Sequence, residues 1–137
     1  MKKSLFIALL MVAATAGVKA QVESPDDLNE LYDGYHTIFW DNGAHYSGEI
    51  YSGQFSGKGR MVWADSSYYE GNWSNGMRSG KGEMHWENGK VYYGRWKNDE
   101  PHGKGQMEWP TGKMYRGKFS HGKITGKGKM KFENGDI

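Results

Sequence analysis

Four lysines have the type and the spacing that could bind phosphate groups. Each lies between two glycines, and they recur every 23 residues as Lys58, Lys81, Lys104 and Lys127. If each interval spans two neighbouring strands, their amines lie about 10 Å apart in one column. Such a column suits the anionic headgroups of lipids or glycans, although a row of lysines is more often simply a solvated face.

The sequence offers no residue set for catalysis or metal binding. It contains no cysteine, and no two of its histidines have the spacing of metal ligands. A Ser-His-Asp set, a P-loop and an HExxH motif are also missing. We therefore expect a protein that is not an enzyme and that uses no cofactor or metal. The histidines, which we expect at the surface or in turns, are His36, His45, His85, His102 and His121.

The aromatic residues form two classes, those that recur along the chain at a fixed interval and those that do not. The recurring ones, together with the methionines between them, predict a packing core, although such a ladder could also stack against sugars. This structural ladder includes Tyr69, Trp73, Met84, Trp86, Tyr92, Trp96, Trp109 and Tyr115. The others are better candidates for contacting a ligand, and they are Tyr35, Tyr51, Phe55, Tyr68 and Tyr93.

A repeat of 23 residues, without insertion or deletion, must position these side chains. Each unit opens with a tyrosine, has a glycine two residues later and a glycine pair further on. We assign a half unit to residues 34–45 and full units to residues 46–68, 69–91, 92–114 and 115–137. A fixed period in this range indicates a repeat architecture. Such proteins present an extended surface more often than they build a catalytic pocket.

Each unit contains two stretches in which apolar residues or glycines alternate with polar residues. This period is typical of a half-buried strand, whereas glycines at these positions would each cost a helix about 1 kcal/mol. The sequence therefore predicts an all-β fold, an elongated single twisted sheet of antiparallel hairpins. The glycine pairs are expected to leave bare backbone on the apolar face, where an aromatic ring can lie.

The turn that follows Trp86 is predicted to be a three-residue loop, a type I turn completed by a glycine bulge. A two-residue loop would place Trp86 and Tyr92 on opposite faces, and Pro110 in the next unit fits only the type I geometry. In the three-residue register Met84 faces Tyr92, and the recurring aromatics share one face. Because Ser66 replaces the turn glycine, its turn is expected to be looser.

The first 20 residues predict a secretory signal peptide of bacterial type. A basic start precedes a short apolar run, and a Val-Lys-Ala sequence before Gln21 resembles a cleavage site. The protein is then exported and is periplasmic or secreted. The alternative is an uncleaved membrane anchor, which the short apolar run disfavours.

Residues 21–33 predict a short helix that caps the array. Ser24 and Pro25 are typical of a helix start, and two acids follow them in the first turn. Leu28, Leu31 and Tyr32 would then lie on one face of this helix.

Charge is nearly balanced overall but differs between the two ends. Without the predicted signal peptide, 15 basic and 16 acidic residues remain, so nucleic acid is not an expected partner. Residues 21–57 contain seven acids and no lysine or arginine, whereas residues 115–137 contain six bases and two acids. Opposite charges favour approach of one end to the other.

The C-terminal end is therefore a candidate site of interaction. The repeat register stops at its last residue, and an uncapped end strand presents unpaired backbone groups. We expect this end to bind an acidic protein partner or, head to tail, another copy. A symmetric dimer of C-terminal ends would bring like charges together. The candidate residues are Lys123, Lys127, Lys129 and Lys131.

Residues 69–76, with the sequence Tyr-Glu-Gly-Asn-Trp-Ser-Asn-Gly, are followed by Gly-Lys-Gly at 80–82 and Glu-Asn-Gly at 87–89. This pattern closely resembles the MORN (membrane occupation and recognition nexus) repeat, and the resemblance covers residues 34–137. It departs from the pattern at Ile50, Ser66 and Asp99. The resemblance implies an elongated sheet of hairpins without catalytic residues of its own. It also implies a lipid-binding, oligomerising or protein-docking module.

Two functions are left open by the sequence. The first is an exported, non-enzymatic scaffold that mediates protein–protein interaction or self-assembly in the cell envelope. The second is a binder of anionic lipid or glycan headgroups through the lysine column.

Overall fold

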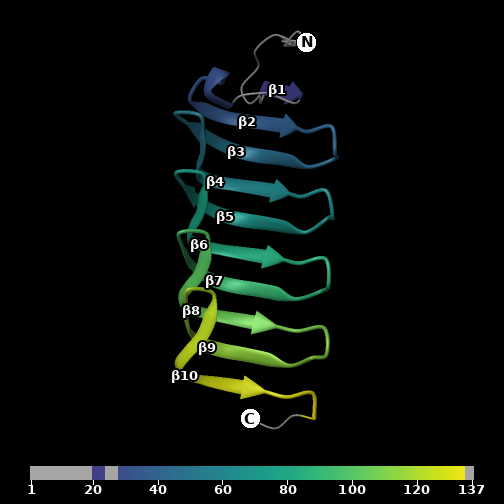
Figure 1. Ribbon diagram of the computed structural model, residues 1–137, viewed down its shortest axis with the longest axis vertical. Helices are drawn as coiled ribbons and strands as arrows, with labels where there is room; N and C mark the ends of the chain where they lie inside the picture. The colour runs from purple at the N-terminus through teal and green to yellow at the C-terminus, as the bar shows by residue number, and fades with distance from the viewer. Residues whose placement is uncertain (1–19, 24–27, 135–137) are drawn as a thin grey trace, which may run out of the picture.

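A computed structural model describes residues 20–23 and 28–134 of the chain. Its ten strands form one sheet in which each strand pairs with the next along the sequence (Figure 1). Strands β2 to β10 are antiparallel, and β1 lies parallel to β2 at the edge. The strands are β1 (Ala20–Glu23), β2 (Gly34–Phe39), β3 (His45–Tyr51), β4 (Gln54–Val62), β5 (Tyr68–Ser74), β6 (Met77–His85), β7 (Val91–Lys97), β8 (Glu100–Glu108), β9 (Met114–Ser120) and β10 (Lys123–Lys131).

The predicted three-residue turn and its register are confirmed. The backbone N–H of Trp86 donates to the carbonyl of Lys90 across 2.9 Å, and Gly89 has the left-handed φ of +86° that the bulge requires. Met84 consequently pairs with Tyr92 across β6 and β7. This register places the recurring aromatics on one face of the sheet.

The expectation of a looser turn at Ser66 is wrong. The N–H of Ser66 donates to the carbonyl of Trp63 across 2.9 Å, and the N–H of Trp63 donates to Ser67 across 2.9 Å. Ser66 adopts a left-handed φ of +70°, a region that costs a residue with a Cβ about 1–2 kcal/mol. The pairing of the flanking strands therefore imposes the turn geometry even on a serine.

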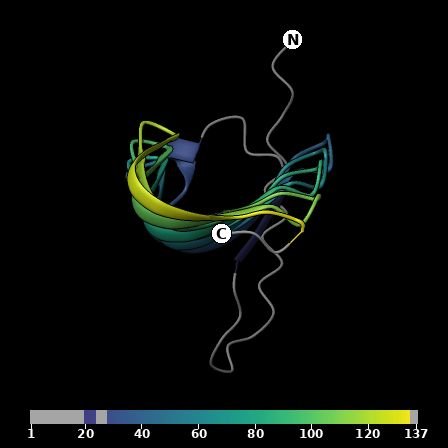
Figure 2. The same cartoon turned by 90° about the horizontal axis from the view of Figure 1, so that it is seen from below.

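The other hairpins close through two-residue turns at residues 52–53, 75–76, 98–99 and 121–122. We call the closing ends of these hairpins the arms. In each turn both central residues have positive φ, as in a type I′ turn; Asn75 and Gly76 are at +50° and +74°. Asp99 keeps this geometry at +69° although it replaces a glycine. The arms curl upward at one side, so the sheet is curved and has one concave and one convex face (Figure 2).

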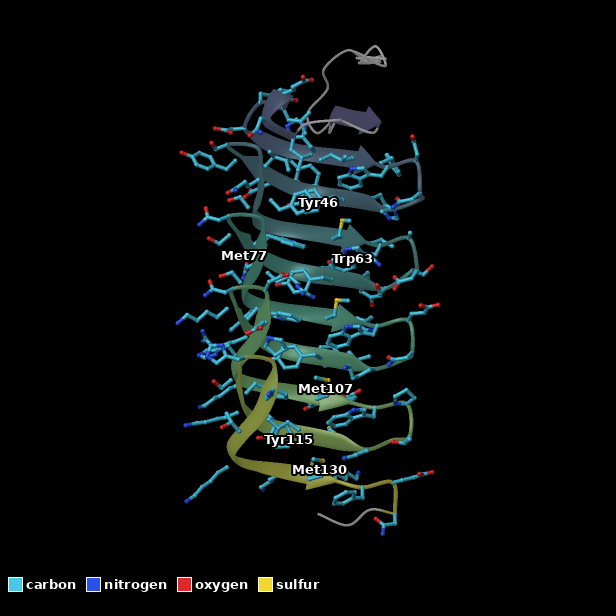
Figure 3. All side chains as sticks on the ribbon, viewed as in Figure 1. Tyr46, Trp63, Met77, Met107, Tyr115 and Met130 are labelled. Atoms are coloured by element: carbon cyan, nitrogen blue, oxygen red, sulfur yellow. The ribbon has the colours of Figure 1, made fainter. Side chains whose placement is uncertain are left out.

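The core lies on the concave face of the sheet. Tyr46, Met107 and Tyr115 project from the ribbon towards the viewer in Figure 3, on the side over which the arms curl in Figure 2. The side chains of Tyr46, Tyr69 and Tyr92 are fully buried although the sheet has no second layer. The buried hydrophobic residues are Ile38, Ala44, Tyr46, Ile50, Met61, Tyr69, Trp73, Met84, Tyr92, Trp96, Met107, Tyr115 and Phe119.

The glycine pairs make room for the tyrosine that opens each unit. A Cβ added to Gly71 would lie 2.4 Å from the Cα of Gly82 and 2.8 Å from the Tyr69 hydroxyl, and a Cβ on Gly82 would overlap the Tyr69 ring. The tyrosine therefore packs directly against the glycine backbone, and its hydroxyl donates to the carbonyl of Asn72 across 2.8 Å. Backbone is thus the second wall of the core, which explains how a single sheet buries its tyrosines.

Two members of the predicted structural ladder are less buried than expected. Trp86 and Trp109 are half-buried, beside the three-residue turns. The Nζ atom of Lys90 lies 4.4 Å from the centre of the Trp86 ring, and that of Lys113 lies 5.0 Å from the Trp109 ring. Lysine stems therefore cover these rings in place of another layer of core.

The N-terminal cap is a single 3-10 turn at Leu28–Glu30, not a longer helix, within the described residues. The predicted helix start at Ser24 and Pro25 lies outside these residues, as does the signal peptide up to residue 19. Leu28 and Leu31 nevertheless pack against the core, as a cap requires. Strand β1 was not predicted. No helix in the described part of the chain is long and apolar enough to cross a membrane.

Candidate interaction surfaces

The lysine column lies on the convex face, opposite the aromatic core. The four lysines are exposed, and their strand partners are polar: Lys81 pairs with Arg95, and Lys104 pairs with Lys118. A shallow hollow of the surface is lined by Lys104, Lys118 and Lys127 together. The column therefore continues across neighbouring strands, because an arginine or lysine fills each gap between the lysines in the C-terminal half.

We call the five cations on strands β6 to β10 the basic stripe. None of them forms an ion pair among the described residues, and all are exposed. Strand spacing of about 4.8 Å gives the stripe a length of about 20 Å. The stripe consists of Lys81, Arg95, Lys104, Lys118 and Lys127. Lys58 is not part of it, because Asn72 stands between Lys58 and Lys81.

Arg95 and Lys118 were not among the predicted binding residues, although the predicted strand register places them on the solvated face beside the lysine column. That register places Gly82 opposite Gly94, so the residues beside these glycines, Lys81 and Arg95, must face each other. The lysines between glycines were predicted because, among the basic residues, they alone recur in every unit.

The non-recurring aromatics do not gather at one place. Phe55 belongs to the core, where its ring stacks on Tyr46 with the ring centres 3.9 Å apart. Tyr51 is 66% exposed next to an arm turn. Tyr68 and Tyr93 line the convex face, where Tyr68 stacks on His85. Tyr35 borders the hollow that contains Lys58. These positions do not define a single ligand site.

Apart from His102 and His121, whose ring centres lie 5.7 Å apart, the histidines have separate structural surroundings. His36 is fully buried, and its Nε2 lies 2.8 Å from the carbonyl oxygen of Tyr32 in the cap. His85 contacts Glu83, His121 contacts Glu100, and His45 stacks on Phe39. Across residues 28–134, no three acidic or histidine side chains are grouped as metal ligands require. The expectation of surface histidines is therefore wrong for His36, whose burial follows from its place under the cap.

The buried tyrosines have no acid–base role near neutral pH. Burial raises the pKa of Tyr92 to about 12, and it also raises the pKa values of Tyr46 and Tyr69. Each hydroxyl donates to a backbone carbonyl; that of Tyr92 reaches the carbonyl of Arg95 across 2.7 Å. These hydroxyls bond to backbone of their own strands and stay protonated.

Arg78 links two neighbouring arms, and this contact was not predicted from the sequence. Its Nε lies 2.6 Å from a carboxylate oxygen of Asp99, and its guanidinium lies 4.5 Å from the centre of the Trp96 ring. Burial opposes ionisation of Asp99, but hydrogen bonds from Arg78 outweigh it and lower the pKa of that carboxyl. The arginine thus covers the core at the place that Phe55 occupies one unit earlier.

The C-terminal end differs from the other units in exposure. Among the described residues, β10 pairs with β9 alone, and its four lysines are exposed. Ile124 is 43% exposed, whereas Phe55, Arg78 and Pro101 at the equivalent positions are half-buried. The structure therefore leaves backbone, charge and an apolar side chain accessible on one edge.

Comparison with known families identifies the repeat. The family model described as MORN repeat matches the chain four times in succession, at residues 46–68, 69–91, 92–114 and 115–137. No significant match was found among curated proteins.

Proposed function

This chain belongs to the MORN repeat family, and we propose that it is an exported, non-enzymatic scaffold whose basic C-terminal end binds a protein partner or another copy. MORN repeats generally mediate protein or membrane interactions and are generally not enzymes. The observation that carries the proposal is the exposure of β10, where Lys123, Lys127, Lys129 and Lys131 are all accessible together with Ile124.

The rest of the molecule suits the role of a scaffold. Each unit contacts only its neighbours, and the sheet extends in one direction. The arms add a second tie between units: the N–H of Gly76 donates to the carbonyl of Phe55, and that of Asp99 donates to Arg78. This double connection holds the C-terminal edge in a fixed orientation.

Light scattering of residues 21–137 at low and high salt tests the self-assembly form of the proposal. Head-to-tail association between an acidic and a basic end predicts a mass that rises with concentration and falls with salt. A monomer under every condition would leave only a heterologous partner. Assembly that persists when Lys123, Lys127, Lys129 and Lys131 are all changed to Glu would contradict the charge mechanism.

The second candidate function is binding of anionic lipid or glycan headgroups through the lysine column. The observation that favours it is the basic stripe, in which Arg95 and Lys118 extend the column to adjacent strands. Co-sedimentation with vesicles containing a fifth of anionic lipid tests it, with neutral vesicles as the control. Changing Lys81, Lys104 and Lys118 to Glu should abolish binding if the stripe carries it. Binding that survives this change would exclude the stripe as the site.

A further inference from the structure

From the row of half-buried aromatic residues on the concave face we infer that the hollow between Trp40 and Trp63 binds a lysine side chain of a partner protein. We call this hollow the tryptophan slot, and Figure 3 labels its Trp63. The inference goes beyond the proposed function, because the slot lies beside strands β2 to β4, away from the β10 lysines, and receives a cation. The lining of the slot includes Trp40, Asn42, Ala44, Met61, Trp63 and Asp65.

An aromatic residue follows or ends the second strand of every unit, directly before the three-residue turn. The first residue after each turn pairs with that aromatic residue and separates it from the next one. Because neighbours in this row are two strand spacings apart, their side chains lie about 10 Å from each other. The row consists of Trp40, Trp63, Trp86, Trp109 and Phe132, and the residues in its gaps are Ala44, Ser67, Lys90 and Lys113.

Lysines of the chain itself occupy the gaps after Trp86 and Trp109. The Nζ atom of Lys113 lies 5.0 Å from the centre of the Trp109 ring and 5.8 Å from that of the Phe132 ring. The Nζ atom of Lys90 lies 4.4 Å from the centre of the Trp86 ring. The face of an aromatic ring attracts an ammonium group within about 6 Å of its centre. A gap between two aromatic residues at this spacing therefore accommodates one alkylammonium group.

The tryptophan slot has the same kind of aromatic walls but no lysine between them. Ala44 takes the position of the lysine, and its side chain ends at the Cβ atom, buried in the floor of the slot. Among the described residues, no lysine or arginine lies over the Trp40 ring. Arg78 lies 5.9 Å from the centre of the Trp63 ring, but its charge is paired with Asp99. An ammonium group from another molecule can therefore take the place that a lysine takes in the later gaps.

A carboxylate at the rim of the slot favours a cation. Asp65 is exposed, and its Oδ1 atom accepts hydrogen bonds from the hydroxyl and the N–H of Ser67. These bonds lower the pKa of Asp65, so its carboxylate is ionised at neutral pH. Residues 21–57 also contain no lysine or arginine that would repel a cation. The slot thus combines two aromatic rings with one negative charge.

The primary ammonium group of lysine suits this site better than a quaternary ammonium group. It carries three N–H donors, so it can bond to the Asp65 carboxylate while the ring faces attract its charge. A quaternary ammonium group, such as that of a choline lipid, has no donor for the carboxylate. The apolar stem of a lysine also packs along aromatic rings, as at Trp86 and Trp109. The slot therefore selects a lysine of a partner protein over a lipid headgroup.

Two-dimensional NMR of the full chain, titrated with Nα-acetyl-lysine methylamide, tests the inference. The indole N–H signals of Trp40 and Trp63 should shift in a saturable way, while those of the other tryptophans should not. The norleucine analogue has a similar stem without the charge and should bind about tenfold more weakly or less. The trimethyl-lysine analogue keeps the charge without a donor and should bind about threefold more weakly than lysine.

A matched pair of variants separates the slot from general charge attraction. Ala44→Lys places in the slot the lysine that the later units carry, and it should abolish binding of the probe. Asn72→Lys adds the same charge on the convex face, where Arg95 and Lys118 stand in later units, and should bind like the wild type. Thermal melts show whether both variants are folded.

A conservative variant of the rim keeps the inference testable even if Ala44→Lys does not fold. Asp65→Asn retains a turn acceptor, as Asn42 and Asn88 do when they accept the N–H of Ala44 and Lys90. We expect this variant to keep the fold of the turn and to bind the probe about threefold more weakly, because the bond to the ammonium loses its charged partner.

Four results would overturn the inference. They are the absence of a saturable shift, equal binding of the norleucine analogue, wild-type binding by a folded Ala44→Lys variant, and wild-type binding by Asp65→Asn. Tighter binding of the trimethyl-lysine analogue would overturn the assignment to lysine and would favour a quaternary ammonium ligand. None of these results bears on the scaffold proposal, which depends on the β10 lysines and has its own test.

Discussion

At the scale of single residues, the contact between a tyrosine and a glycine pair is the basic unit of this core. A double-mutant cycle on Tyr69 and Gly82 tests it. Gly82→Ala should destabilise by about 1–3 kcal/mol, because the added methyl overlaps the ring. Tyr69→Phe should cost about 1 kcal/mol for the lost hydrogen bond to Asn72. The double variant should cost less than the sum, because the hydroxyl oxygen is the atom nearest to the added methyl and its removal relieves part of the overlap with the tyrosine. Strict additivity in denaturant unfolding would show that the two residues do not interact.

The buried tyrosines also predict how stability depends on alkaline pH. Burial raises the pKa of Tyr92 from 10.0 to about 12. Because the folded-state pKa is the higher one, this contribution is complete below about pH 10 and is lost as the pH rises towards 12. Melting temperatures measured over this range should fall less steeply for Tyr92→Phe than for the wild type. Tyr51→Phe, at a 66% exposed position, is the control and should keep the wild-type slope. Identical slopes for all three proteins would refute this account.

At the scale of elements, the two kinds of turn are fixed by strand register, and Ser66 shows the cost of that constraint. Ser66→Gly should stabilise the protein by about 0.5–1 kcal/mol, since glycine tolerates the left-handed φ but loses more entropy on folding. Gly112→Ser at the equivalent position, where an added Cβ meets no atom within 4 Å, should destabilise by a similar amount, so the pair serves as a reciprocal control. Thermal unfolding gives both values. A destabilising Ser66→Gly would mean that the serine side chain stabilises the turn.

The strands and three-residue turns could be predicted from the sequence, whereas some contacts between elements could not. Asn88-Gly89 and Asn75-Gly76 share a dipeptide but form different turns, and the first was distinguished by the requirement of a common aromatic face and by Pro110 in the next unit. The Arg78–Asp99 contact escaped prediction because it joins residues 21 positions apart through arms whose curl depends on tertiary packing. The partial exposure of Trp86 escaped it for a related reason: periodicity identifies a face, not how far the face is covered.

Part of the candidate site could be predicted from the sequence, because strand alternation decides which residues share a face of the sheet. The lysine column and the β10 lysines follow from this alternation. Arg95 and Lys118, which extend the column across neighbouring strands, were not predicted as binding residues, because they do not recur in every unit.

At the scale of the whole molecule, export decides which partners the scaffold can meet. Export with cleavage before Gln21 predicts an intact mass that corresponds to residues 21–137 for the protein recovered from the periplasm or medium. Mass spectrometry of the cell-derived protein measures it. A mature species that retains residues 1–20 would contradict cleavage, and recovery of the protein only from the cytoplasm would contradict export.

The central claim, that the basic C-terminal end is the binding surface of the scaffold, is tested most directly by quantitative affinity capture from the cell envelope. Three baits are compared by mass spectrometry: the wild type, a variant with Lys123, Lys127, Lys129 and Lys131 changed to Glu, and a control with Lys58, Lys81 and Lys104 changed to Glu. The account predicts that the wild type and the control recover the same partner, which the C-terminal variant loses. Equal recovery by the C-terminal variant, or loss of the partner only in the control, would contradict it.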